Sequence, residues 1–83
     1  MEYYLKPSAI KSLKRLARVI QKRIFSKLDF YIKTGNPLKF AETLKDKTLG
    51  DFRFRIEEFR VIFDVEKDKI IILKIGHRRD IHR

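Results

Sequence analysis

Cysteine is absent from this 83-residue sequence. Disulfide bridges, thiol nucleophiles and thiolate metal sites are therefore excluded. Histidine is also scarce: the chain has only His77 and His82, and neither lies in a pattern of spaced carboxylates that would indicate a metal site. We expect no bound metal and no cofactor, so any bond cleavage by this chain should proceed without a metal ion.

Long apolar runs are missing as well. No stretch approaches the ~20 residues needed to span a bilayer, and the first residues lack the basic and then apolar pattern of a secretion signal. We therefore expect a cytoplasmic protein with no membrane partner. The length leaves room for one domain, residues 1–83, and its core must be compact because so short a chain buries only about 60–65% of its unfolded surface.

Acidic residues are few relative to basic ones. Lys and Arg together number 21 against 11 Asp and Glu, which gives a net charge of +10. Such an excess favours association with polyanions such as nucleic acid, ribosomes or anionic membranes, or with an acidic protein partner. It carries no information about the fold.

The spacing of apolar residues predicts an α+β fold. Pro7 should end a short first strand, and Ser8 is a candidate helix N-cap. A helical hairpin follows, ended by Gly35 and Pro37, and the connection after it has room for one helical turn around residues 40–44. The sequence then predicts a three-stranded antiparallel sheet. The predicted elements are a strand at residues 2–6, helices at about 9–20 and 24–32, and strands at about 51–56, 59–65 and 69–75.

Residues 52–60 read Phe-Arg-Phe-Arg-Ile-Glu-Glu-Phe-Arg, an alternation that places apolar side chains on one face of a strand and arginines on the other. If a hairpin closes on a two-residue turn at Glu57 and Glu58, Arg55 lies directly opposite Arg60. Like charges opposed across a sheet cost a few tenths to ~1 kcal/mol. We therefore expect an anion to sit between these two arginines.

The same alternation predicts which side chains share a face. Arg53, Arg55, Arg60 and Ile62 should share the open face, away from the helices, and Arg78 joins them if the alternation continues past the glycine at position 76. Exposed isoleucines among these cations would suit a partner that carries acidic and apolar residues. In the last strand we expect Ile71, Leu73 and Ile75 in the core, and Ile70, Ile72 and Lys74 on the open face.

A single arginine on an exposed strand is usually a solvated residue, but four converging from neighbouring strands are typical of a phosphate site. Arginine stabilises a developing negative charge, yet its pKa above 12 prevents it from transferring protons at neutral pH. Histidine is the natural proton carrier. Strand parity directs His77 toward the core, whereas His82, near the end of the chain, could fold over the arginine face. Glu57 and Glu58, most simply solvated in the turn, could also act as a base.

Four segments of the sequence resemble the RelE/ParE toxin superfamily, and its RelE branch most closely. They are Thr-Gly-Asn-Pro-Leu-Lys-Phe from position 34, Leu-Gly-Asp-Phe-Arg-Phe-Arg-Ile from 49, Phe-Arg-Val-Ile-Phe-Asp-Val from 59 and Ile-Gly-His-Arg-Arg-Asp-Ile from 75. The resemblance covers essentially the whole chain. It implies a toxin that cleaves mRNA in the ribosomal A site without a metal, using the 2′-hydroxyl of the substrate as nucleophile and leaving a cyclic phosphate. It also implies a cognate antitoxin as partner, besides ribosome and mRNA.

The resemblance also assigns roles to individual residues. Arg53 and Arg55 correspond to a pair of basic positions that are lysines in several relatives. Arg60 and Arg78 correspond to arginines suited to holding the scissile phosphate. His82 stands where a tyrosine is common, and with a pKa near ~6.5 it would be a competent general base for the 2′-hydroxyl.

Two other functions remain open from the sequence. A ParE-like toxin shares this fold but is a non-enzymatic poison of a topoisomerase. An inactive relative, or a plain RNA-binding module, would keep the basic face and lack the chemistry.

Overall fold

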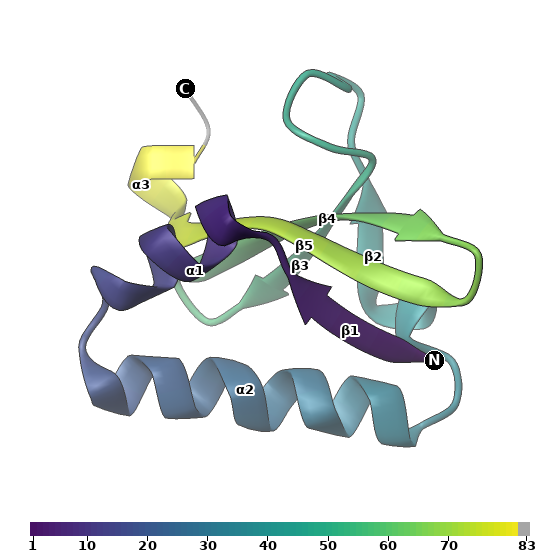
Figure 1. The fold of residues 1–83 in the computed structure, drawn as a ribbon, viewed down its shortest axis with the longest axis horizontal. Helices are drawn as coiled ribbons and strands as arrows, with labels where there is room; N and C mark the ends of the chain where they lie inside the picture. The colour runs from purple at the N-terminus through teal and green to yellow at the C-terminus, as the bar shows by residue number, and fades with distance from the viewer. Residues whose placement is uncertain (82–83) are drawn as a thin grey trace.

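The computed structural model describes residues 1–81 and contains one five-stranded sheet with a long helix along one face (Figure 1). The strand order is β1-β5-β4-β3-β2, in which β1 is parallel to β5 and the other neighbours are antiparallel. The predicted α+β class and order of elements are confirmed, but the sheet has five strands because β1 and β2 also pair into it. The elements are β1 (Glu2–Leu5), α1 (Pro7–Lys14), α2 (Arg18–Lys33), the 3₁₀ helix η1 (Pro37–Phe40), β2 (Ala41–Thr43), β3 (Phe52–Ile56), β4 (Phe59–Glu66), β5 (Lys69–His77) and α3 (Arg78–Ile81).

Stacked aromatic rings join α2 to the sheet. The ring of Tyr31 on α2 lies 4.5 Å from that of Phe40 and 4.8 Å from that of Phe54, and Phe54 stacks on Phe63 of β4 at 4.4 Å. Phe54 and Phe63 are fully buried. Rings of this size dominate core energetics, so this stack fixes which residues of β3 and β4 face α2.

The two helices are separated by a short break. α1 ends at Lys14 and α2 begins at Arg18, so Ile20, which the apolar spacing placed in the first helix, belongs to the second. The side chain of Gln21 donates to the Leu16 carbonyl at 2.9 Å within this break. The predicted glycine end is confirmed: Gly35 has φ +80° and its N–H donates to a carbonyl in the last turn of α2.

Two serine hydroxyls form hydrogen bonds with backbone groups at the outer edge of β5, beyond the point where β1 stops pairing with it. Ser8 donates to the Leu73 carbonyl at 2.8 Å, and Ser12 accepts from the Ile75 N–H at 3.0 Å. The interpretation of Ser8 as a helix N-cap was wrong, because the cap position is Lys6 and makes no side-chain hydrogen bond. Both hydroxyls instead hold α1 against the sheet edge.

A bulge in β5 reverses part of the predicted facing pattern. Ile62 pairs with Lys74 but the next residue of β4 pairs with Ile72, so Leu73 is the extra residue. Ile70 and Ile72 therefore lie in the core, and the prediction that placed them on the open face was wrong. The assignments after the bulge, Ile75 in the core and Lys74 exposed, are confirmed.

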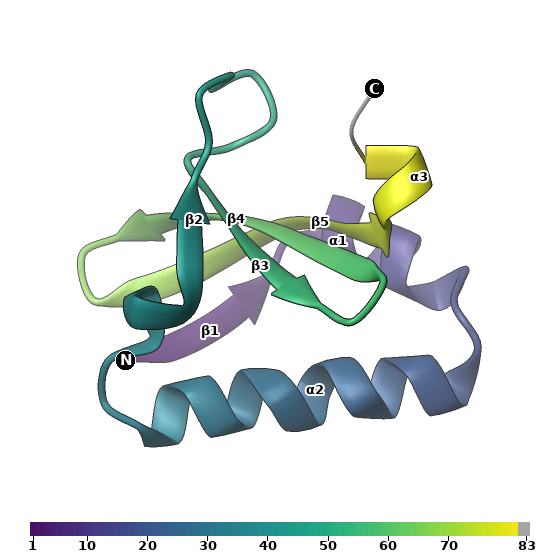
Figure 2. The same cartoon turned by 180° about the vertical axis from the view of Figure 1, so that it is seen from behind.

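Two short elements were not predicted correctly. The helical turn expected around residues 40–44 lies earlier, as η1, and is followed by β2, which pairs with β3 so that Glu42 lies opposite Arg53. The segment after β5 forms the single turn of α3. α3 and the loop of residues 44–51 both stand on the sheet face opposite α2 (Figures 1 and 2).

The loop of residues 44–51 covers part of the open face. Its Asp51 N–H donates to the Asp64 carboxylate at 2.8 Å, and Gly50 lies directly over Ile62. Ile62 is only 1% exposed although it faces away from α2. With Ile62, Ile70 and Ile72 all buried, the prediction of exposed isoleucines among the cations was wrong.

Gly50→Ala should lower the free energy of unfolding by about 1–3 kcal/mol, the usual cost of overpacking. A Cβ at this position would lie 2.7 Å from Cγ2 of Ile62 and 3.0 Å from Cδ1 of Leu73. Urea denaturation followed by circular dichroism measures the change. Lys47→Ala, in the same loop and exposed, is the matched control and should leave stability unchanged; equal stability of the two variants would show that the loop does not pack as described.

Candidate functional site

The four arginines selected from the sequence lie at one end of the open face. Arg53 and Arg55 belong to β3, Arg60 to β4 and Arg78 to the start of α3. The predicted hairpin turn at residues 57–58 is confirmed, and Arg55 pairs directly with Arg60 across the two strands. We call Arg53, Arg55, Arg60 and Arg78 the arginine cluster. Strand alternation brings the first three together, and the turn into α3 adds the fourth.

Arg60 is buried at the base of the cluster. Its side chain is 5% exposed, and its Nη1 donates to the backbone carbonyls of Glu57 at 3.1 Å and Phe59 at 2.9 Å. Its Nε is buried and has no hydrogen-bond partner within residues 1–81. Burial lowers the pKa of Arg60 from its usual value, and the positive charges of the other three arginines lower it further. A buried cation with an unused donor among like charges is an unbalanced arrangement that an anion would correct.

The sequence reasoning missed Glu42, whose carboxylate lies between two arginines of the cluster. Glu42 Oε1 accepts from Arg53 Nε at 3.0 Å, and lies 3.0 Å from Arg53 Nη2 and 3.5 Å from Arg55 Nε. A three-residue strand gives little periodicity to detect. The contact of Glu42 with the arginines follows only from the pairing of β2 with β3, which places Glu42 opposite Arg53.

The acidic turn residues are exposed, as the sequence predicted, and each also pairs with a basic side chain. Glu58 Oε1 lies 3.0 Å from Arg78 Nε, and Glu57 Oε1 lies 3.5 Å from Arg23 Nη1. Arg78 is also fixed through its backbone, because its N–H donates to the Glu58 carbonyl at 2.8 Å. The turn and α3 are therefore linked at the edge of the arginine cluster.

The four arginines differ in exposure. The side chains of Arg55 and Arg78 are 59% and 56% exposed, whereas that of Arg53 is 17% exposed. Arg60 and Arg53 are thus held in place by the protein, while Arg55 and Arg78 reach toward solvent. A phosphate above Arg60 could contact the fixed guanidinium of Arg60 and the exposed guanidinium groups of Arg55 and Arg78 at once.

The described residues include one of the two histidines, His77. His77 ends β5 half-buried, packs edge-on to the ring of Phe59 at 5.5 Å, and accepts at Nδ1 from the Arg79 N–H at 3.2 Å. In a neutral ring this hydrogen bond leaves the proton on Nε2. The packing on Phe59 agrees with the expected placement of His77 on the core side. His82, the predicted general base, lies outside the described residues.

α3 packs on a glycine of the open face. Gly76 pairs with Arg60, and a Cβ on Gly76 would lie 3.2 Å from Cγ1 of Ile81. Ile81 is 2% exposed, so it occupies the space that a larger residue at position 76 would fill. This contact brings the last described turn of the chain beside the arginine cluster.

Within residues 1–81, no three His, Asp or Glu side chains gather as they would around a metal ion. None of the helices in this part of the chain is long and apolar enough to span a membrane.

Comparison with known proteins identifies the family. A family model described as the ParE toxin of type II toxin–antitoxin systems matches residues 3–82. The RelBE2 toxin–antitoxin complex from Mycobacterium tuberculosis contains a chain with a TM-score of 0.76 and 20% identity, covering 93% of this chain and 96% of that one. The RelB–RelE complex from Methanococcus jannaschii gives 0.69 and 23%, covering 94% and 93%. A search of curated proteins gave no match.

The two solved structures share the fold of this chain, and the family model spans nearly all of its sequence. The resemblance inferred from the sequence is therefore confirmed at the level of the superfamily. The chain belongs to the RelE/ParE family of toxins from type II toxin–antitoxin systems.

Proposed function

We propose that this toxin is a metal-independent endoribonuclease that cleaves mRNA on the ribosome, with the scissile phosphate held in the arginine cluster. The observation that carries the proposal is Arg60, a buried guanidinium that lies opposite Arg55 and whose Nε has no hydrogen-bond partner within residues 1–81. Holding these like charges together is costly in the free protein. A bound phosphate removes that cost, so the site favours a phosphorus centre that gains negative charge during reaction.

In the proposed reaction the 2′-oxygen of a ribose forms a bond to the adjacent phosphorus. The bond from phosphorus to the 5′-oxygen of the next nucleotide breaks, which leaves a 2′,3′-cyclic phosphate. The arginines stabilise the added charge on the phosphoryl oxygens, a contribution worth about 10²–10³-fold in rate for one well-placed donor. Arg60 and Arg53 supply fixed donors, and Arg55 and Arg78 close on the phosphate from the solvent side.

Two protons must also move, and arginine carries neither at neutral pH. One leaves the 2′-hydroxyl and one reaches the departing 5′-oxygen. We assign the first to His82. Glu42 is a second candidate for the same proton, since its carboxylate contacts both Arg53 and Arg55.

A non-enzymatic action remains the alternative, and one observation favours it: the matching family model is described as a ParE toxin. In that case the arginine cluster would contact a topoisomerase and no proton carrier would be needed. An inactive RNA-binding relative would bind message without cutting it. Blocked DNA supercoiling with intact messages would support the first, and RNA binding with neither effect would support the second.

The partner in the cell is proposed to be a cognate antitoxin. A toxin with a net charge of +10 suits an acidic partner segment that neutralises the arginine cluster. We place the complex in the cytoplasm, where ribosomes and message are available. Retention of RNA affinity after antitoxin is added would argue against inhibition by blocking the site.

Replacing Arg60 with Gln should slow message cleavage about 10²–10³-fold, because it removes a donor that stabilises the transition state. The measurement is cleavage of message on translating ribosomes, followed by primer extension. Arg78→Ala, a change at an exposed side chain, keeps the test valid if Arg60→Gln folds poorly. Lys22→Gln, on the exposed side of α2, removes one charge elsewhere and should cut normally. Wild-type rates for both arginine variants would exclude the proposed site.

Replacing His82 with Ala should slow cleavage about 10²–10⁴-fold, the usual contribution of a general base. A base must be deprotonated to act, so the wild-type rate should rise with pH through a midpoint near ~6.5 and then level off. His82→Tyr should retain activity with that midpoint moved upward, since the tyrosine pKa is about 10. If His82→Ala keeps the wild-type rate and pH profile, His82 is not the base, and Glu42→Gln then tests the second candidate.

A further inference from the structure

A second feature of the open face lies around Tyr4, far along β5 from the arginine cluster. A hollow of about 380 Å³ is lined by Tyr4, Glu66, Lys67, Lys69 and Ile71. Its volume falls within the range of small-ligand sites, about 300–1,000 Å³. Apolar and aromatic surface from Tyr4 and Ile71 is combined there with two cations and one carboxylate. We call this hollow the tyrosine pocket.

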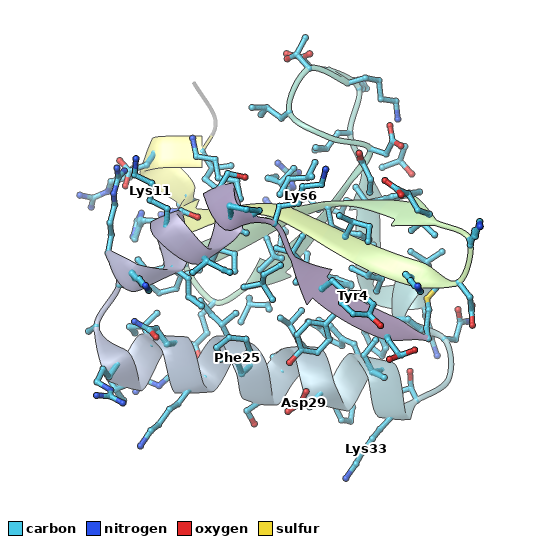
Figure 3. All side chains as sticks on the ribbon, in the orientation of Figure 1. Tyr4, Lys6, Lys11, Phe25, Asp29 and Lys33 are labelled. Atoms are coloured by element: carbon cyan, nitrogen blue, oxygen red, sulfur yellow. The ribbon has the colours of Figure 1, made fainter. Side chains whose placement is uncertain are left out.

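The tyrosine pocket opens on the same sheet face as the arginine cluster. Tyr3, the preceding residue, packs on Phe25 at 6.4 Å and donates to Asp29 at 3.0 Å, so it points toward α2. Successive strand residues point to opposite faces, and Tyr4 therefore points away from α2, beside its pairing partner Ile71. Figure 3 shows Tyr4 on β1 and Asp29 on α2 below it.

Tyr4 is presented as a stacking surface. Tyr4 is 46% exposed, and the Nζ of Lys69 lies over its ring, 5.4 Å from the ring centre. The hydroxyl at the far end of the ring donates to Glu2 Oε1 at 3.2 Å. An exposed ring combined with nearby cations is the arrangement that binds single-stranded nucleic acid, because bases stack on the ring and phosphates meet the cations.

We propose that the tyrosine pocket binds a nucleobase of the same RNA strand whose phosphate lies in the arginine cluster. The base stacks on the ring of Tyr4, and the Nζ of Lys69 leaves its position over that ring to contact an adjoining phosphate together with Lys67. Glu66 accepts from the amino or imino group on the edge of the base. The inference rests on the proposed function for its strand, although the pocket is defined by its own residues. An acidic peptide would satisfy the lysines but leave the ring unstacked and face Glu66 unfavourably.

The spacing of the two sites suits an extended strand. Gly76 pairs with Arg60 and Ile71 pairs with Asp64, and these partners are four residues apart on β4, a distance of about 13 Å along a strand. Lys74 lies between Ile71 and Gly76 on β5 and is exposed. A few nucleotides would therefore span the distance, passing beside the loop of residues 44–51, whose Gly50 lies against Leu73 between the two sites.

The test is binding of 2′-O-methyl RNA, which cannot be cleaved through its 2′-oxygen, followed by fluorescence anisotropy. A dinucleotide reaches the arginine cluster alone, whereas an oligonucleotide of about eight residues reaches both sites. Tyr4→Ala should weaken binding of the longer strand about 5- to 140-fold, the usual worth of one stacked base, and leave binding of the dinucleotide unchanged. Tyr4→Phe should keep wild-type affinity for both.

Phe30 provides the matched control. It is 52% exposed on α2, with the Nζ of Lys27 5.6 Å from the ring centre, so it repeats the ring and cation of the tyrosine pocket on the opposite layer. Phe30→Ala should leave RNA affinity unchanged. Lys67→Gly removes a cation at a position with φ +57°, which glycine adopts without strain; it should reduce the salt slope by about 0.7.

The outcomes separate the two proposals. Equal affinity of Tyr4→Ala and the wild type for the longer strand would overturn the tyrosine pocket. Loss in both Tyr4→Ala and Tyr4→Phe would also overturn it, because the hydroxyl and not stacking would then be responsible. Selective loss in Tyr4→Ala from a protein that cuts no message would uphold the pocket and reject the nuclease.

Discussion

The constraint on which the structure depends is the aromatic stack that joins α2 to the sheet. Tyr31, Phe54 and Phe63 can pack together only if alternate residues of β3 and β4 face α2. The residues between them must then face the other way. These residues include Arg53 and Arg55 on β3 and Arg60, which lies opposite Arg55, on β4. Core packing therefore creates the cationic surface, and a one-residue slip would bury arginines and expose phenylalanines.

That surface carries an electrostatic cost that the protein offsets only in part. Glu42 pairs with two arginines of the cluster and Glu58 with a third. Arg60, the one buried charged residue within residues 1–81, instead uses backbone carbonyls, which provide partial charge but no full neutralisation. The remaining imbalance is therefore concentrated at one buried guanidinium rather than spread over the basic surface.

Sequence patterns predicted those features that depend on neighbouring residues. The hairpin turn and the opposition of Arg55 and Arg60 follow from alternation over nine residues and are confirmed. The predicted facing of β5 was wrong from Leu73 toward the start of the strand because β5 has a bulge there. Leu73 is contacted by the Ser8 hydroxyl of α1 and by Gly50 of the loop above it, and a pattern read along one strand contains neither contact. Glu42 escaped detection for a similar reason, since its short strand exists only through pairing with β3.

The division of the arginine cluster into fixed and exposed members has a consequence for binding. A guanidinium already held by backbone carbonyls, as in Arg60, loses little conformational entropy when an anion arrives. Arg55 and Arg78 lose more, yet their exposure allows them to exchange Glu42 and Glu58 for a phosphate without first breaking a buried pair. In the proposed site the carboxylates would thus hold the exposed arginines near a bound phosphate, while the cost of desolvating a charge falls on Arg60 during folding. Binding energy would then be available for that phosphate rather than for ordering the protein.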